Sequence, residues 1–346
     1  MATLTVHKFS KTKSGEIVRL FRFENGTVSV DVLNLGAAVA AVRTPDKSGK
    51  LADICLGYSD AAGYEEQDCY FGVVVGRYAN RIRGGQFQLN GQAYQLDQND
   101  HGNCLHSGAA GFDKRLWDWE TEGDTLILRL ESPDAEGGFP GNLRVEVRYR
   151  LTDENELVID YRGVCDQDSI LNLTNHSYFN LNGHGRGDIL RHQLRINASR
   201  FTRVDAEAIP TGELPSVEGT PFDFREFHPV GERIGQEDPD LQAVGGYDHN
   251  FVLDGEGLRE AACLKESYTG RRLTVYTDLP GIQVYAGNML KGESGKSGAR
   301  YGKRSGIALE TQYFPDSPNR PEFPSCVKKA GEIYESRTVY RFDVET

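Results

Sequence analysis

A histidine suited to proton transfer lies in the segment 170–181, ILNLTNHSYFNL, in which apolar and polar residues alternate. In a β-strand this alternation sends neighbouring side chains to opposite faces. His176 then shares a face with four polar residues, Asn172, Thr174, Tyr178 and Asn180. A solvent-exposed face usually carries Lys or Glu, so we interpret this face as the lining of a wet cavity. The alternative is a polar outer face with an incidental histidine.

Two further alternating segments carry candidate side chains. In 306–314, GIALETQYF, Glu310 shares a face with Ala308 and Gln312. A lone glutamate is more often exposed to solvent, but the rigid turn at 314–319, FPDSPN, is typical of a pocket rim. In 281–287, GIQVYAG, the amide of Gln283 can both donate to and accept from a sugar hydroxyl, or it can lie at the surface.

Three loops offer additional binding groups, because loops on a rigid β scaffold often carry binding residues. The loop 76–84, GRYANRIRG, contains Asn80 and Arg81, and 105–112, LHSGAAGF, contains His106. The loop 245–251, GGYDHNF, contains Asp248. Each loop alone is a weak signal, since an arginine such as Arg81 is more often a surface charge and an aspartate such as Asp248 more often a turn former.

Several reaction classes lack their sequence signatures. The chain has no Walker-type phosphate loop and no dinucleotide-binding fingerprint after a strand. It also lacks the G-x-S-x-G elbow of serine hydrolases. The eight histidines form neither H-x-H nor H-E-x-x-H clusters, although His101 and His106 are near in sequence. We therefore expect no metal site.

The charge balance argues against polyanionic partners. The 39 basic and 51 acidic residues give a net charge of −12. Nucleic acid and anionic membranes would be repelled at long range, whereas a neutral sugar would not be affected.

The cysteines and the N-terminal segment indicate a cytoplasmic protein. The six cysteines form no C-x-x-C pair, and scattered unpaired thiols suit a reducing compartment. Residues 1–20 contain three lysines and no apolar run of the kind found in signal peptides. Apolar stretches such as 71–75 are too short to span a bilayer.

The elements that must hold these residues are predicted to be β-strands. Period-two alternation recurs at 28–32, 142–151, 157–161 and 273–275. Asn90-Gly91 between two alternating runs predicts a hairpin. Only 231–241 suggests a short helix. Glycine and proline are spread along the chain with no linker, so we expect one all-β domain over 1–346, a large antiparallel β-sandwich.

Seven blocks of the sequence, in this order, resemble the aldose 1-epimerase (galactose mutarotase) family. They are GRYANRI (76–82), LHSGAAGFDKRLW (105–117), GGFPGNL (137–143), NLTNHSYFNLNG (172–183), GTPFDFR (219–225), GYDHNF (246–251) and LETQYFPDSPN (309–319). The blocks cover essentially the whole chain. The set is far more specific than any one block.

The resemblance implies a large antiparallel β-sandwich, with few short helices, that interconverts the α and β anomers of free aldohexoses such as galactose and glucose without a cofactor. It implies His176 as general acid and Glu310 as general base. It implies six sugar-binding residues: Asn80, Arg81, His106, Tyr178, Asp248 and Gln283. Two positions depart from the family pattern. Ser107 stands where glycine is usual, and Ala330 where proline is frequent.

The implied reaction requires an acid and a base. Opening the hemiacetal ring removes a proton from the C1 hydroxyl and delivers one to the ring oxygen, and we expect the two groups on opposite sides of that bond. A carboxylate accepts a proton at neutral pH, and a histidine kept charged by its neighbours donates one.

Three alternative functions have their own requirements. A phosphosugar epimerase on the same fold needs several basic residues converging on a phosphate, and only Arg77, Arg81 and Arg83 lie near one motif. A glycosidase needs two carboxylates at the cleaved bond. A non-catalytic carbohydrate-binding protein would lack the acid or the base, and both are present here.

Overall fold

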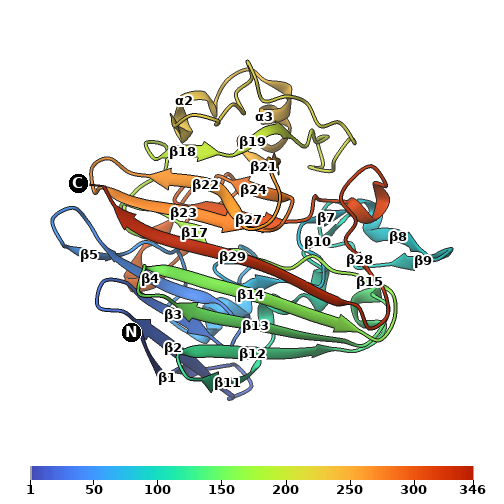
Figure 1. Ribbon diagram of the computed structural model, residues 1–346, viewed down its shortest axis with the longest axis horizontal. Helices are drawn as coiled ribbons and strands as arrows, with labels where there is room; N and C mark the ends of the chain where they lie inside the picture. Colours follow the sequence, from blue (N-terminus) through green and yellow to red (C-terminus); the bar gives the residue numbers. More distant parts are fainter. Residues whose placement is uncertain (1, 346) are drawn as a thin grey trace.

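The computed structural model of the protein describes residues 2–345, and its largest element is a nine-stranded antiparallel sheet (Figure 1). The strands follow one another in the order β11 (Asp118–Glu122), β12 (Thr125–Ser132), β13 (Leu143–Leu151), β14 (Glu156–Cys165), β29 (Ile333–Val344), β23 (Arg271–Thr277), β22 (Arg259–Lys265), β18 (Gln193–Ile196) and β20 (His228–Pro229). In β13 the residues from Leu143 to Leu151 alternate between buried and more exposed, as the period-two pattern predicts.

Two five-stranded antiparallel sheets complete the layers. One consists of β1 (Thr3–Lys11), β2 (Ile17–Glu24), β3 (Ser29–Leu33), β4 (Val39–Pro45) and β5 (Leu51–Asp53). The other, which we call the site sheet, has the order β17 (Tyr178–Phe179), β27 (Ile307–Gln312), β24 (Gly281–Tyr285), β21 (Asp248–Leu253) and β19 (Ala198–Phe201). One buried apolar cluster joins all three sheets, with Val30, Val147 and Ile282 among its members. The predicted antiparallel β-sandwich is therefore confirmed.

Shorter elements lie around the sheets. The predicted Asn90-Gly91 hairpin is formed by β8 (Gln86–Leu89) and β9 (Gln92–Gln95), with both turn residues at positive φ. The other small pairs are β6 (Val74–Val75) with β16 (Thr174–Asn175), β7 (Arg81–Ile82) with β10 (Cys104–Leu105), β15 (Ser169–Ile170) with β28 (Val327–Lys328), and β25 (Glu293–Ser294) with β26 (Arg300–Tyr301).

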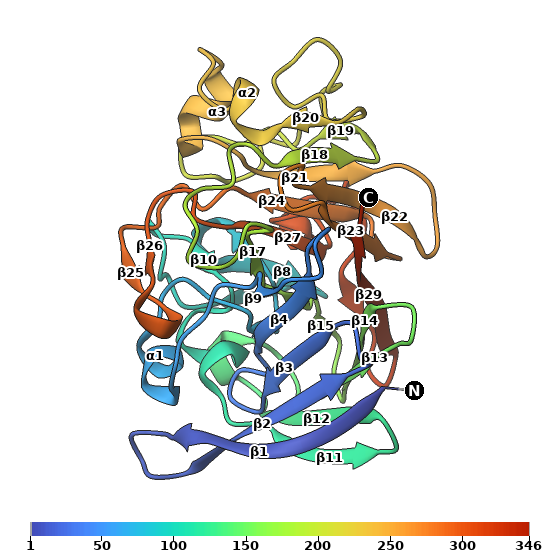
Figure 2. The same cartoon turned by 90° about the vertical axis from the view of Figure 1, so that its left-hand side faces the viewer.

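Helices are few and short. Residues 2–345 form three α-helices, α1 (Ala61–Glu66), α2 (Val230–Arg233) and α3 (Pro239–Val244). The helix expected over 231–241 is thus two separate helices, because Asp238 caps a new helix that starts at Pro239. Both lie at the end of the molecule opposite β1 (Figures 1 and 2). In the described part of the chain, every helix is too short or too polar to cross a membrane.

The expectation that 170–181 forms one strand is wrong. The segment contains three short pieces, β15, β16 and β17, and each pairs with a different partner, β28, β6 and β27. Every side chain from Ile170 to Leu181 is buried, so the segment has no wet face of five polar residues. The chain crosses the interior here, and its polar side chains bond to backbone from several segments. Asn172, for example, exchanges hydrogen bonds with Tyr313 and donates to the carbonyl of Ala79.

The cysteines are unpaired, as expected. All six are free thiols, and all but Cys69 are buried. Burial raises the pKa of most of these thiols, for example that of Cys55 to about 12, which keeps them protonated and unreactive.

Candidate active site

The site sheet has one apolar and one polar face in the region of β21, β24 and β27. Ile282, Val284 and Leu309 point into the core. In the register, Gln283 lies directly between Asn250 and Glu310 on the neighbouring strands. The side chains of this row therefore share the face away from the core, as the alternation in 281–287 and 306–314 predicts.

A cavity of about 270 Å³ opens on this polar face. Its lining includes all eight residues that the sequence pointed to: Asn80, Arg81, His106, His176, Tyr178, Asp248, Gln283 and Glu310. They come from segments more than two hundred residues apart in the chain. The other residues of the lining are Asp68, Cys69, Tyr70, Asp100, Leu105, Tyr285, Met289, Leu290, Lys291 and Glu293.

His176 and Glu310 meet in this cavity. The Nε2 atom of His176 lies 3.4 Å from Oε1 of Glu310, and both side chains are at most 5% exposed. The imidazole is stacked between Tyr178 and Tyr70, with ring centroids 5.0 and 5.8 Å away. The acid and base that we expected on opposite sides of the reacting bond are therefore adjacent.

Burial affects this pair in two directions. It raises the pKa of Glu310 well above the usual range, and the nearby charge of Asp248 raises it further while Arg81 opposes the shift. It lowers the pKa of His176. Burial thus disfavours the charged form of each group, and an opposite charge on the neighbour would favour it.

His106 occupies a different position from His176. Its Nδ1 accepts the backbone N–H of Asn80 at 3.0 Å, so the proton of the neutral ring must be on Nε2. Burial, together with the charges of His176 and Arg81, lowers the pKa of His106 well below its usual value. His106 therefore remains neutral and presents one fixed N–H donor.

The two departures from the family pattern have structural explanations. Ser107 adopts φ +70°, the conformation that glycine adopts without strain, and its hydroxyl exchanges hydrogen bonds with the backbone N–H and C=O of Tyr78. The backbone N–H of Ala330 donates to Asp168 at 2.9 Å. Proline has no N–H and would lose that bond.

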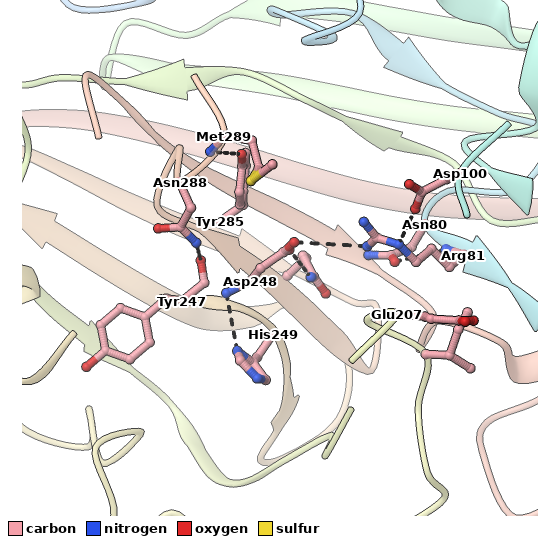
Figure 3. Close-up of polar contacts among 12 residues, drawn as sticks. Asn80, Arg81, Asp100, Glu207, Tyr247, Asp248, His249, Tyr285, Asn288 and Met289 are labelled. Atoms are coloured by element: carbon pink, nitrogen blue, oxygen red, sulfur yellow. Dashed lines mark hydrogen bonds and ion pairs between the residues drawn. The ribbon is translucent and has the colours of Figure 1, made fainter. Parts of the chain in front are cut away.

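Arg81 is held between two carboxylates (Figure 3). Its Nε donates to Asp100 at 2.7 Å, and its Nη1 lies 4.0 Å from Asp248. Burial disfavours the charged guanidinium, but Asp248 and Asp100 outweigh it and raise the pKa of Arg81. Burial also raises the pKa of Asp248, against the effect of Arg81.

The neighbouring arginines do not converge on the cavity. Arg77 is buried elsewhere, with its guanidinium bonded to Ser132 and to the carbonyls of Pro133 and Pro140. Arg83 pairs with Asp205. Among residues 2–345, Arg81 and Lys291 are the only arginine or lysine residues in the lining, and Lys291 is exposed to solvent.

Gln283 is oriented by its neighbours. Its Nε2 donates to Oδ1 of Asp248 at 2.7 Å, and its Oε1 accepts from Gln312 at 3.3 Å. The carbonyl is thus engaged within the protein. One N–H of the amide is not used within the protein, so Gln283, expected from sequence both to donate and to accept, has a free donor here.

One group of side chains has the composition of a metal site. His106, His176 and Glu310 each offer one ligand atom, and these atoms lie within 4.8 Å of one another. A histidine that binds metal through Nε2 normally donates its Nδ1–H to a neighbour. The Nδ1 of His106 instead accepts a backbone N–H, so Nε2 keeps its proton and cannot coordinate. The donor set therefore does not fit a resident metal ion.

The lining contains residues that were not predicted from the sequence, among them Tyr70, Asp100 and Tyr285, and three residues predicted to share a face with His176 lie outside it. Tyr70 packs edge-on against His106 at 4.6 Å, Asp100 anchors Arg81, and Tyr285 flanks Gln283 on β24. Alternation indicated only Tyr285, which follows Gln283 by two residues. The three residues that were predicted to share the face of His176 but do not line the cavity are Asn172, Thr174 and Asn180, which are buried elsewhere.

The protein is similar to known proteins over nearly its whole length. The family model described as aldose 1-epimerase matches residues 19–341. Galactose mutarotase of Bos taurus is 43% identical over 94% of each chain, and aldose 1-epimerase of Escherichia coli K12 is 38% identical over 96% of this chain and 97% of the relative. The solved structure of galactose 1-epimerase from Lactobacillus acidophilus matches the fold with a TM-score of 0.88 at 28% identity, covering both chains completely. By sequence and fold, the chain belongs to the aldose 1-epimerase family.

Proposed function

We propose that this protein is an aldose 1-epimerase, an isomerase that interconverts the α and β anomers of free aldohexoses such as D-galactose and D-glucose. The observation that carries the proposal is the contact between His176 and Glu310 on the floor of a polar, sugar-sized cavity. Relatives named galactose mutarotase and aldose 1-epimerase, similar over almost the full length, support it.

The adjacent pair suits ring opening. The C1 hydroxyl and the ring oxygen are bonded to the same carbon, so two side chains that lie together reach both oxygens. Glu310 takes the proton of the C1 hydroxyl while protonated His176 gives one to the ring oxygen. Rotation about C1–C2 exposes the other face of the aldehyde. Ring closure then reverses both transfers, and neither a cofactor nor a covalent intermediate is required.

In its active form the buried pair of His176 and Glu310 carries one proton in total. Addition of a second proton neutralises the base, and loss of the last one removes the acid. Because the two groups interact, the pKa values that limit activity belong to the pair and not to either residue. The neutral His176 with protonated Glu310 and the ion pair are tautomers that differ in which of two atoms 3.4 Å apart, Nε2 of His176 and Oε1 of Glu310, carries the proton.

The remaining wall residues suit a ring rich in hydroxyls. His106 and Arg81 present N–H donors that can stabilise developing negative charge on sugar oxygens. Asp248 provides an acceptor for hydroxyl protons, and Tyr178, which is stacked on His176, an aromatic wall. Asn80 and Gln283 add amide donors. A site that pairs with hydroxyls discriminates strongly against sugars that lack them.

The alternative functions have less support. A phosphosugar substrate needs clustered basic residues, and Arg77 and Arg83 are bonded elsewhere. A catalytically silent binding protein would have no reason to bring a buried acid and base together in its binding cavity.

Polarimetry tests the proposal. Freshly dissolved α-D-galactose and α-D-glucose should reach their equilibrium rotation much faster with the enzyme than without it. The 6-phosphates should be poorer substrates at equal concentration. If neither free sugar reaches equilibrium faster with the enzyme, the proposed function is contradicted. A clear preference for a sugar 6-phosphate would favour the phosphosugar alternative.

A cytoplasmic location is part of the proposal. It is supported by six free thiols, because unpaired cysteines persist in reducing compartments. Cell fractionation with antibody detection would test it, and recovery in an oxidising compartment would contradict it.

A further inference from the structure

Gln312 lies beneath the cavity floor and connects amides that reach the cavity. Its side chain is fully buried and is not part of the lining. Its Oε1 accepts from Nδ2 of Asn80 at 3.4 Å. Its Nε2 donates to Oδ1 of Asn250 at 3.2 Å and to Oε1 of Gln283 at 3.3 Å. An amide nitrogen carries two hydrogens, and both are used here.

We call the hydrogen-bonded side-chain amides of Asn80, Gln312, Asn250 and Gln283 the relay. The orientation of its amides is fixed at both ends. At one end, the backbone N–H of Arg81 donates to Oδ1 of Asn80 at 2.9 Å, and a backbone N–H cannot reverse its role. The Nδ2 of Asn80 must then face the carbonyl of Gln312. At the other end, Gln283 donates to the carboxylate of Asp248, which is an acceptor when ionised. Rotating any one amide by 180° would place two donors or two acceptors together.

This direction decides what the cavity offers to a ligand. With one hydrogen of each nitrogen used inside the protein, Asn80 and Gln283 each have a second N–H, and both residues line the cavity. Their carbonyl oxygens already accept from Arg81 and Gln312. Both amides can therefore donate an N–H to a bound ligand, while the carboxylates of Asp248 and Glu310 provide acceptors.

The backbone leaves room for the relay at one position. Gly281 on β24 pairs directly with Gln312 on β27. A Cβ atom at Gly281 would lie 2.4 Å from Oδ1 of Asn250, the atom that accepts from Gln312. A side chain at Gly281 would therefore push the amide of Asn250 away from Gln312.

We propose that Gln312 is a positioning residue for sugar recognition: it never touches the sugar, but it holds Asn80 and Gln283 as donors toward the sugar oxygens. The inference rests on the proposed sugar-binding function of the cavity. It adds a specificity-determining residue that acts entirely through others. A purely structural role for Gln312 would affect stability and leave sugar affinity unchanged.

Gln312→Met tests the inference, because methionine keeps the length of the side chain and removes all three hydrogen bonds. We expect the Kd for equilibrated D-galactose, measured by calorimetry, and the KM to rise about tenfold, which corresponds to losing roughly one hydrogen bond. The limbs of the pH profile should stay in place, since His176 and Glu310 are untouched. A folded variant with unchanged Kd and KM would overturn the inference.

Two further variants sharpen the test. Gln312→Glu keeps the shape and polarity of the side chain, but an ionised glutamate can only accept hydrogen bonds, so this variant should also raise the Kd. It replaces Gln312→Met in the test if the methionine variant does not fold. In Gln283→Met/Gln312→Met, the combined loss of affinity should be at least about threefold smaller than the product of the two single losses. Multiplicative losses would show that Gln312 does not act through Gln283.

The calorimetric readout separates this inference from the proposed function. If the wild-type protein binds galactose but does not accelerate mutarotation, the proposed function fails while the relay is still tested by Kd. If the wild type is active and Gln312→Met binds galactose normally, only the relay fails.

Discussion

Glu310→Gln removes the proposed base and changes little else, because glutamine keeps the shape of the side chain but cannot take a proton. Loss of a positioned base alone should lower kcat/KM by about a thousandfold. A second effect acts through His176, whose Nε2 lies 3.4 Å from the carboxylate. At that distance and an effective dielectric constant of about 20, the attraction of the ion pair is about 5 kcal/mol. Without it the buried imidazole loses its proton more readily, so the thousandfold loss is a lower bound.

The same substitution should not destabilise the protein. The pKa of Glu310 is raised by burial, so the folded state binds this proton more tightly than the unfolded chain does. The free energy of unfolding therefore falls as the pH rises from the pKa of Glu310 in the unfolded chain through its higher pKa in the folded protein. Glutamine never ionises and avoids this cost. We expect a Tm at neutral pH equal to or above that of the wild type.

The assay is polarimetry of freshly dissolved α-D-galactose, combined with thermal unfolding of the same preparation. A matched control is Glu266→Gln, which changes another buried carboxylate, one that accepts the backbone N–H groups of Tyr268 and Thr269 outside the cavity. It should lower the Tm and leave kcat/KM of the folded protein near normal. Folded Glu310→Gln with mutarotation within tenfold of the wild type would refute the assignment of the base.

The remaining predictions concern the other groups of the site. A plot of kcat/KM against pH should be bell-shaped for the wild type. His176→Asn should lower kcat/KM on the order of a hundredfold or more. The alkaline limb should be absent in this variant, since only deprotonation of Glu310 then limits the rate. His106→Asn should weaken binding and keep both limbs, because His106 stays neutral; the reverse pattern would mean that the two histidines have exchanged roles. Exhaustive chelation should leave the rate unchanged, and activity that is lost and then restored by one divalent ion would contradict the tautomer of His106. Asp100→Asn loosens Arg81 and should raise the KM several-fold in initial-rate measurements, whereas a fall in kcat alone would argue that Asp100 acts elsewhere.

The site sheet shows where reasoning from the sequence succeeds. Period-two alternation in 281–287 and 306–314 correctly placed Gln283 and Glu310 away from Ile282 and Leu309, because these segments are continuous strands with one face in the core. A strand repeats its side-chain direction every two residues whatever its partners are. The faces of β24 and β27 are therefore readable from the chain alone.

The same reasoning fails where the chain is not a continuous strand. The alternation in 170–181 suggested one face with five polar residues, but the backbone pairs with three different strands in turn within this segment. His176 and Tyr178 reach the cavity, while Asn172 and Asn180 bond to backbone in the interior. A local pattern carries no information about which distant segments will pair with it.

The sequence by itself determined the β-rich architecture, the family, and the eight residues that meet at the cavity, because strand alternation and motif blocks are local properties of the chain. Only the tertiary structure decided that His176 and Glu310 lie side by side, that His106 is a fixed neutral donor, and that Asp100 anchors Arg81. It alone also set the direction of the amides around Gln312. Protonation, tautomer and amide orientation depend on which donor or acceptor stands within about 3 Å, and in this molecule those partners come from strands and loops that only folding brings together.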